Sequence, residues 1–177
     1  EGATYYQEVN TTFVDPGTVT TDDSDGDISW KVVADYTNLN TSELGTYEIP
    51  YTVTDNAGHT TTKIRTVIVR DTTKPILKVV PATLNVPQNS DWNIFAGVSA
   101  TDNFDASEDI RLVSDPVSID TNVQRTYIIK YKAVDTSGNE SDWIERTVNI
   151  ADSGLGNIVS DSLSCAPGSE CYYPSTS

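Results

Sequence analysis

The feature that most constrains this chain is an internal duplication with a period of about 80 residues. The segment Thr46–Asp55 is matched by Thr126–Asp135, and Arg65–Asp71 is matched by Arg146–Asp152. The copies contain short alternating apolar runs but no heptads and no sustained helical periodicity, so the sequence predicts two all-β units of the sandwich type. The expected boundaries are residues 1–74, residues 75–152, and a short C-terminal tail at residues 153–177.

The clearest strand lies at the centre of the first copy. Between Thr46 and Asp55, apolar and polar residues alternate, so one face is expected to be buried. The inward residues of this strand are Tyr47, Ile49, Tyr51 and Val53. Asn56–His59 then predicts a hairpin turn, with the partner strand at residues 60–69. Upstream, Ile28, Trp30 and Val32 are expected to share the inward face of another strand.

Net charge excludes one class of partner. The chain carries 26 acidic and 11 basic residues, for a formal net charge of −15. Nucleic-acid binding depends on lysine and arginine at phosphates, so no nucleic-acid partner is expected. An acidic surface of this kind is instead suited to divalent cations or a saline extracellular setting. No apolar run approaches the roughly 20 residues that span a bilayer, so no membrane insertion is expected.

Two acidic loops are the strongest candidates for a binding site. The first contains four carboxylates in six residues, at Asp22, Asp23, Asp25 and Asp27. Its counterpart in the second copy contains Asp102, Asp105 and Asp109. Calcium takes six to eight oxygen ligands, and acidic turns relieved by glycine supply them at short range, so the loops predict Ca²⁺ binding. The spacing is not that of an EF-hand, and the alternative is a set of Asx turns and solvated loop charges.

Topology favours a metal site at the junction of the two domains. In a sandwich of this type, the acidic loop and the last hairpin turn lie at the end where the chain enters the domain. Asp71, in the Asp71–Pro75 linker, is therefore expected to meet Asp102, Asp105, Asp109 and Asp135, much as calcium sites stiffen cadherin linkers. Asp55 would take the place of Asp135 in the first domain. The alternative is that Asp71 only begins a turn before Pro75.

The matched motifs resemble a known family. They are the Asp-x-x-Asp-Gly-Asp-Ile loop, the strand and turn Gly-Thr-Tyr-x-x-x-Tyr-x-Val-x-Asp-x-Ala-Gly, and the closing Arg-Thr-Val-x-Val-x-Asp-Thr-Thr-x-Pro. Together they are similar to bacterial immunoglobulin-like surface repeats, as found in adhesins, in secreted enzymes and near pesticidal crystal toxins, and to hyalin repeats. The resemblance covers residues 5–152 and implies an extracellular immunoglobulin-like sandwich used as a spacer or binding module.

The second copy departs from this family pattern in its acidic loop. Ala106 replaces the loop glycine, Ser107 and Glu108 are inserted, and Arg125 stands where the first copy has Gly45. The loop is therefore expected to follow a different path from that of the first copy.

An enzyme is not expected. His59 is the single histidine, and it lies in a hairpin turn, so a zinc site or a Ser-His-Asp triad lacks its parts. No Gly-rich phosphate-binding loop precedes a helix. A carboxylate pair for glycoside hydrolysis needs a deep pocket, which domains of this size are not expected to form.

Aromatic residues support an alternative function in carbohydrate binding. The candidates for a platform on which sugars stack are Trp92, Trp143, Tyr172 and Tyr173. Such aromatics more often fill the core, and the alternation around Trp30 and Trp143 favours core positions for both. Tyr47 and Tyr127 are expected to form tyrosine corners rather than ligand contacts.

The tail contains both cysteines of the chain. Cys165 and Cys171 flank Pro167-Gly168, a turn that would bring them together, so the spacing suits a local disulfide in an oxidising compartment. The alternative is two free thiols.

The sequence as a whole predicts a non-catalytic extracellular module at a cell surface or in a secreted protein. It would serve as a stalk, an adhesion spacer or a filament subunit, and calcium would stiffen it. Its expected partners are other domains or copies of the same surface protein, or a host or environmental glycan or protein. In a filament, the tail from Ser153 onward would add a strand to a neighbour's sheet. The alternative is a carbohydrate-binding accessory module.

Overall fold

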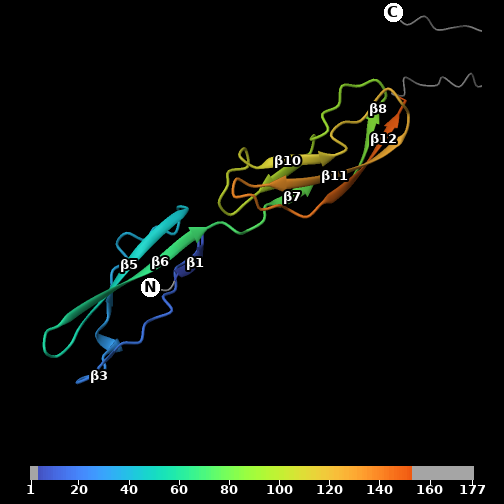
Figure 1. Cartoon of the computed structure of the whole chain (residues 1–177). Helices are drawn as coiled ribbons and strands as arrows, with labels where there is room; N and C mark the ends of the chain where they lie inside the picture. Colours follow the sequence, from blue (N-terminus) through green and yellow to red (C-terminus); the bar gives the residue numbers. More distant parts are fainter. Residues whose placement is uncertain (1–3, 153–177) are drawn as a thin grey trace, which may run out of the picture.

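The computed structural model describes residues 4–152 and consists of two β-sandwiches that lie end to end (Figure 1). The predicted all-β fold with two tandem immunoglobulin-like sandwiches is confirmed. None of the described residues forms a helix long and apolar enough to cross a membrane. The tail, with Cys165, Cys171, Tyr172 and Tyr173, lies outside the described residues.

The first sandwich contains six strands and one short 3-10 helix. In chain order these are β1 (Thr4–Glu8), β2 (Thr21–Asp22), β3 (Gly26–Asp27), η1 (Ser29–Lys31), β4 (Val33–Ala34), β5 (Gly45–Thr54) and β6 (Thr60–Arg70). One sheet has the order β1-β6-β5-β4, with β1 parallel to β6, and β2 pairs with β3. The β5–β6 hairpin and its turn are those predicted.

The second sandwich repeats this plan and adds a strand. Its strands are β7 (Ile76–Val79), β8 (Thr83–Pro87), β9 (Val98–Thr101), β10 (Arg111–Asp115), β11 (Thr126–Val134) and β12 (Ile144–Ala151). The order β10-β11-β12-β8 corresponds to β4-β5-β6-β1, and β8 runs parallel to β12 as β1 does to β6. The turns match as well, since Asn10 after β1 and Asn89 after β8 both have positive φ.

Each sandwich has its own apolar core. Ile49, Tyr51 and Val53 of β5 are buried, as the alternation predicted, and Val67 and Val69 of the neighbouring strand β6 are buried with them. The hydroxyl of Tyr47 donates to the carbonyl of Glu43, a local contact of the tyrosine-corner kind. The second core is larger and centres on Ile129, Tyr131 and Val148.

The predicted core position of Trp30 is wrong. Residues 29–31 form a 3-10 turn rather than a strand, and Trp30 is 80% exposed, with the Lys31 ammonium over its ring. A 3-10 turn has a period of three, so Ile28 stays buried while Trp30 turns outward. Trp143 is also largely outside the core, at 47% exposed.

A buried arginine closes the core of the second sandwich. Arg146 is fully buried and donates hydrogen bonds to the carbonyls of Val80, Pro81, Ala96 and Gly97. The first sandwich repeats part of this arrangement. Arg65 donates to the Gly17 carbonyl and to the Tyr51 hydroxyl. The duplication thus extends to polar contacts, since in both sandwiches an arginine donates to the carbonyl of the glycine ahead of the acidic loop, Gly17 or Gly97.

Candidate metal centre

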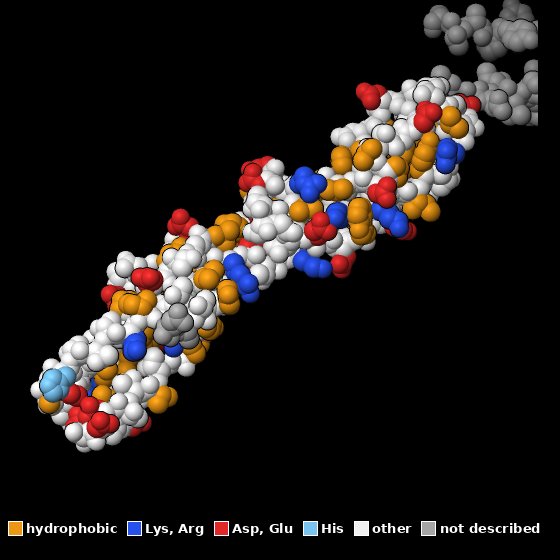
Figure 2. Space-filling view, viewed as in Figure 1, with side chains coloured by type: hydrophobic (Ala, Val, Ile, Leu, Met, Phe, Trp, Pro, Cys, Tyr) orange, Lys and Arg blue, Asp and Glu red, His pale blue; other side chains and the backbone are white. Residues whose placement is uncertain are grey.

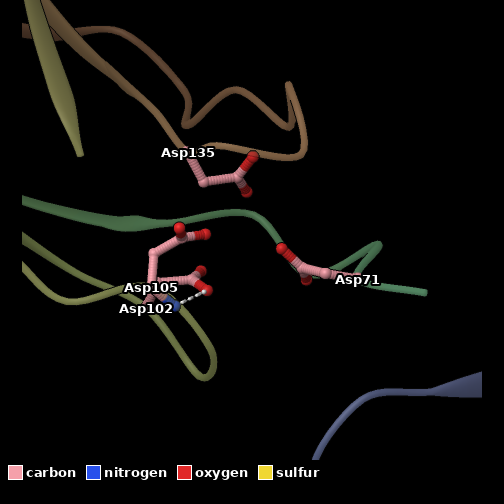
Figure 3. A group of neighbouring side chains, drawn as sticks. All are labelled: Asp71, Asp102, Asp105 and Asp135. Atoms are coloured by element: carbon pink, nitrogen blue, oxygen red, sulfur yellow. Dashed lines mark hydrogen bonds between the residues drawn. The ribbon is translucent and has the colours of Figure 1, made fainter. Parts of the chain in front are cut away.

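Four carboxylates converge where the two sandwiches meet (Figure 3). Asp71 follows β6 in the linker, Asp102 follows β9, Asp105 lies in the acidic loop, and Asp135 follows β11. One oxygen from each lies within 4.8 Å of the others, and the side chains point toward one another. The site therefore draws on the linker and on two loops of the second sandwich.

Local turns hold the three carboxylates of the second sandwich in place. Asp102 Oδ1 accepts hydrogen bonds from the backbone N–H groups of Phe104 (2.9 Å) and Asp105 (3.3 Å). Asp135 Oδ1 accepts from the Asn139 backbone N–H at 2.7 Å. Asp105 accepts from the Thr136 hydroxyl and backbone. The contacts of Asp102 and Asp135 are Asx-type turns, in which the carboxylate is fixed by the backbone that follows it. The Asp105–Thr136 contact instead joins the acidic loop to the turn after β11.

The carboxylates are shielded from water as well as close together. Asp71 and Asp135 are each only 6% exposed. Burial raises the pKa of Asp71, and the charges of Asp102 and Asp135 raise it further, against hydrogen bonds from Thr73 and Ser137 that lower it. Among the described residues, no lysine or arginine forms a salt bridge with any of the four.

One oxygen in the cluster has no partner. Asp102 Oδ2 is buried and makes no hydrogen bond with the described residues. Asn139 Nδ2, in contrast, donates to Asp135 Oδ2 at 2.8 Å and to Asp71 Oδ2 at 3.3 Å. A buried carboxylate oxygen without a donor is costly, because it has lost its water and gained nothing in exchange.

The donor set fits calcium. Ca²⁺ binds oxygen ligands at 2.3–2.6 Å, so two ligands on opposite sides of one ion are about 5 Å apart, which matches the spread of these four oxygens. The cluster contains no sulfur or imidazole ligand, which argues against zinc. Carbonyls and water would complete the six to eight positions that calcium takes.

The structure leaves Asp109 out of this group. Asp109 is exposed, and its backbone N–H donates to the Ala106 carbonyl in a tight turn made by the inserted residues. Asp109 therefore stands at the outer side of the loop, and the metal-ligand expectation for it does not fit the geometry.

The remaining acidic candidates lie at the far end of the first sandwich, where acidic side chains gather on the surface (Figure 2). Asp22 accepts hydrogen bonds from the N–H groups of Ser24 and Asp25, Asp25 accepts from Asn56, and Asp55 accepts from His59. These contacts repeat those of Asp102, Asp105 and Asp135. Asp23 and Asp27 are exposed, and Asp27 accepts from Ser29. Within residues 4–152, no fourth carboxylate joins this end as Asp71 joins the other.

Sequence reasoning missed three side chains that shape the junction. Phe104, in the acidic loop of the second sandwich, packs against the core cluster of the first. Asn10 Nδ2 donates across the junction to the Asn103 carbonyl at 2.9 Å. The carboxylate of Glu8 accepts from Thr72 and Thr73, which fastens the linker to β1. The sequence did contain a signal for Phe104, which is a large apolar residue in a loop where the first copy has the polar residue Ser24.

The two described glycan-stacking candidates differ in burial. Trp92 is partly buried and packs against the second core. Trp143 is half exposed, with the Lys132 ammonium 5.2 Å from its ring centre. Of the two candidates within residues 4–152, Trp143 is therefore the one that presents an aromatic face of the kind that the carbohydrate hypothesis requires.

Comparison with known proteins gives a family match for the first sandwich. Residues 2–69 match the profile described as "Bacterial surface protein, Ig-like domain". An uncharacterized 81.3 kDa protein of Acholeplasma phage L2 is 29% identical over 147 residues, which are 81% of this chain and 20% of that protein. The chain thus spans about a fifth of the length of this relative.

The solved structures that match this chain superimpose on it with low TM-scores. The CBM51-2 and INT domains of Clostridium perfringens ZmpB, solved with GlcNAc, are 27% identical, covering 45% of this chain and 17% of that one, with a TM-score of 0.36. The fibronectin(III)-like modules of Clostridium thermocellum CbhA are 16% identical, covering 88% and 93%, also with a TM-score of 0.36. Human protocadherin-24 EC1-2 is 18% identical, covering 64% and 69%, with a TM-score of 0.35.

Proposed function

Because residues 2–69 match a bacterial surface Ig-like domain, we propose that this chain is a non-catalytic segment of an extracellular stalk whose joint is stiffened by a calcium ion. The ion would bind Asp71, Asp102, Asp105 and Asp135. The partners would be neighbouring domains or copies of the same surface protein.

The observation that carries this proposal is the unpartnered Asp102 Oδ2 within the four-carboxylate cluster. Four carboxylates at this spacing repel one another, and two of them are nearly buried. A hydrogen bond from Asn139 relieves Asp71 and Asp135 only in part. A divalent cation would offset half of the negative charge of four ionised carboxylates and give Asp102 Oδ2 the partner it lacks.

The mechanical consequence follows from where the four ligands are anchored. Asp71 belongs to a linker that Glu8 ties to the first sandwich through Thr72 and Thr73. The other three ligands belong to the second sandwich. An ion bound to all four would therefore cross-link the two bodies, whereas tandem domains that share only a small interface pivot.

The test is the relative motion of the two sandwiches with calcium and with the chelator EGTA. Residual dipolar couplings measured by NMR report whether both sandwiches share one alignment tensor. The proposal expects one common tensor in calcium and two different tensors in EGTA.

Two variants make this test specific. Asp102→Asn should behave in calcium as the unchanged chain behaves in EGTA, whereas Asp22→Asn, at the equivalent place on the far end, should not. The same result in calcium and in EGTA, whether one tensor or two, would refute the stiffening role.

A carbohydrate-binding role is the second candidate, and the half-exposed Trp143 supports it. An exposed indole face stacks on sugar rings, and Lys132 beside it would add a hydrogen-bond donor. A glycan array with the unchanged chain and with Trp143→Ala tests this role. Binding that disappears in the variant would support it, and an array without a hit would retire it.

A further inference from the structure

The second sandwich contains a strand that has no counterpart in the described part of the first. β7 pairs antiparallel with β9, from Ile76 opposite Thr101 to Val79 opposite Val98. All the other strands of the main sheets correspond between the two sandwiches. The segment equivalent to β9 is residues 18–21, since Asp102 answers Asp22 and Gly97 answers Gly17. Within residues 4–152, no strand pairs with it on the side that β7 occupies.

β7 contributes to the second sandwich in two ways. Leu77 is 8% exposed and belongs to the core cluster, where it lies opposite Ala100. β7 also contacts β11 and β12, so it covers the inner face of the main sheet. The Val80 N–H, just after the strand, donates to the Gly97 carbonyl. The strand thus supplies both an apolar side chain and backbone partners.

The first sandwich shows the gap that such a strand would fill. A groove of about 340 Å³ lies between residues 18–21 and the strands β5 and β6, lined in part by Val32, Tyr51 and Val53. Its walls are thus the counterparts of the surfaces that β7 covers. The core beside it is also smaller, with five buried apolar residues in its cluster against nine in the second sandwich.

The backbone along this groove is unpaired as well. Thr20 directs its N–H to the Ser29 hydroxyl and its C=O to the Ile28 N–H. The backbone N–H and C=O groups of successive residues in an extended segment point to opposite sides. Val19 therefore directs its N–H and C=O away from residues 28 and 29. Neither group of Val19 makes a hydrogen bond with another described residue. An extended edge with free donors and acceptors is a template for one more strand.

We propose that this groove binds a β-strand of the same type as β7, supplied by the linker of an Ig-like repeat that precedes the first sandwich in the same polypeptide. The strand would carry an aliphatic residue at the position of Leu77 to fill the groove above Tyr51 and Val53. Its backbone would pair with Val19, as β7 pairs with β9.

The internal duplication argues for this occupant over a strand from elsewhere. β7 directly follows the linker: the chain leaves the first sandwich at Asp71, and β7 is the first strand of the second sandwich. Three residues, Val80 to Ala82, join β7 to β8, and three residues, Glu1 to Ala3, stand ahead of β1. A strand placed directly ahead of Glu1 therefore has the same spacing to β1 as β7 has to β8.

The experiment adds the strand and measures the Val19 amide. The full chain is extended ahead of Glu1 by a copy of the sequence of Lys74–Val79, and amide hydrogen exchange is followed by NMR. The matched control has the same extension with its leucine and its valine replaced by aspartate, which cannot occupy an apolar groove. The proposal expects exchange at Val19 to slow by at least about tenfold with the apolar extension and to stay unchanged with the control.

Two results would overturn the proposal. Equal exchange at Val19 in the unextended chain and in both extended chains would show that the groove accepts no strand. If the Val19 amide of the unextended chain is already protected from exchange, and this protection increases with protein concentration as a dimer forms, the groove would be assigned to a second copy instead of a preceding linker.

Discussion

A carboxylate oxygen of Asp71 lies within 4.8 Å of one from Asp135, and the Asn139 side chain donates a hydrogen bond to each residue. Asp71 belongs to the linker, whereas Asp135 directly follows β11, a central strand of the second sandwich. This part of the contact between the two bodies therefore brings like charges together, and its strength should depend on what offsets them.

Removing the Asp71 charge should have opposite effects with and without calcium. In EGTA, Asp71→Asn should melt at the same temperature as the unchanged chain or higher, because a buried repulsive charge is gone. In calcium the variant should lose most of the stabilisation by the ion, which is about 2.7 kcal/mol at a concentration 100 times the Kd. Thermal unfolding in calcium and in EGTA measures how the difference in melting temperature between the variant and the unchanged chain changes. The exposed Asp152, the counterpart of Asp71 after β12, provides the control Asp152→Asn, and a variant that melts lower in both conditions would contradict the prediction.

Phe104→Ser should loosen the junction without unfolding either sandwich. Phe104 packs against the first core from the second sandwich, so its loss removes apolar contact between the bodies, about 1–2 kcal/mol for a partly buried ring. Separate melting transitions for the two sandwiches, seen by calorimetry, would report the loss. Val117→Ser, at a site 81% exposed, should leave the transitions as they are. Equal melting curves for all three proteins would show that Phe104 does not couple the sandwiches.

Arg146→Met should destabilise the second sandwich strongly. The fully buried guanidinium serves four carbonyls, and methionine fills similar space but donates to none of them. Stranded acceptors cost about 1–3 kcal/mol each before water enters, so we expect a loss of about 3 kcal/mol or more in urea unfolding. Arg65→Met in the partly exposed equivalent should cost less. The reverse order would contradict the view that Arg146 closes the core.

Stability at acidic pH should depend on Glu8. Burial alone would raise the pKa of Glu8, but hydrogen bonds from Thr72 and Thr73 lower it to about 2, against 4.5 for an ordinary glutamate. A lowered pKa contributes stability that is present above the unfolded value and is lost as pH falls from about 4.5 toward 2. Urea unfolding across this range should show a smaller loss for Glu8→Gln than for the unchanged chain. Asp71 acts in the opposite sense, since a raised pKa favours the folded state at low pH. Parallel pH profiles of unfolding free energy for Glu8→Gln and the unchanged chain would mean that the Glu8 contacts do not form.

Much of the fold could be predicted because the pattern and the duplication act together. Alternation from Tyr47 to Val53 fixes a buried face, and the repeat carries it to β11. Trp30 shows the limit of this reasoning, because three residues suffice for a 3-10 turn and a strand pattern of that length does not exclude one.

The candidate site could be predicted in part. Asp71, Asp102 and Asp135 each directly follow a strand, Asp105 lies in the acidic loop, and the linker and these loops meet at the entry end of the second sandwich. Asp109 does not join them, since the inserted residues form a turn of their own. Asn10 was not foreseen because contacts between two bodies leave no periodic trace in the sequence, whereas Phe104 could have been noticed as an aromatic residue where the first copy has Ser24.

The central claim is that a calcium ion binds at Asp71, Asp102, Asp105 and Asp135, and calorimetric titration of calcium into the metal-free chain tests it most directly. The account predicts a saturable binding event that persists in Asp22→Asn and is lost in Asp102→Asn. Absence of binding heat at millimolar calcium, or binding to Asp102→Asn equal to that of the unchanged chain, would contradict it.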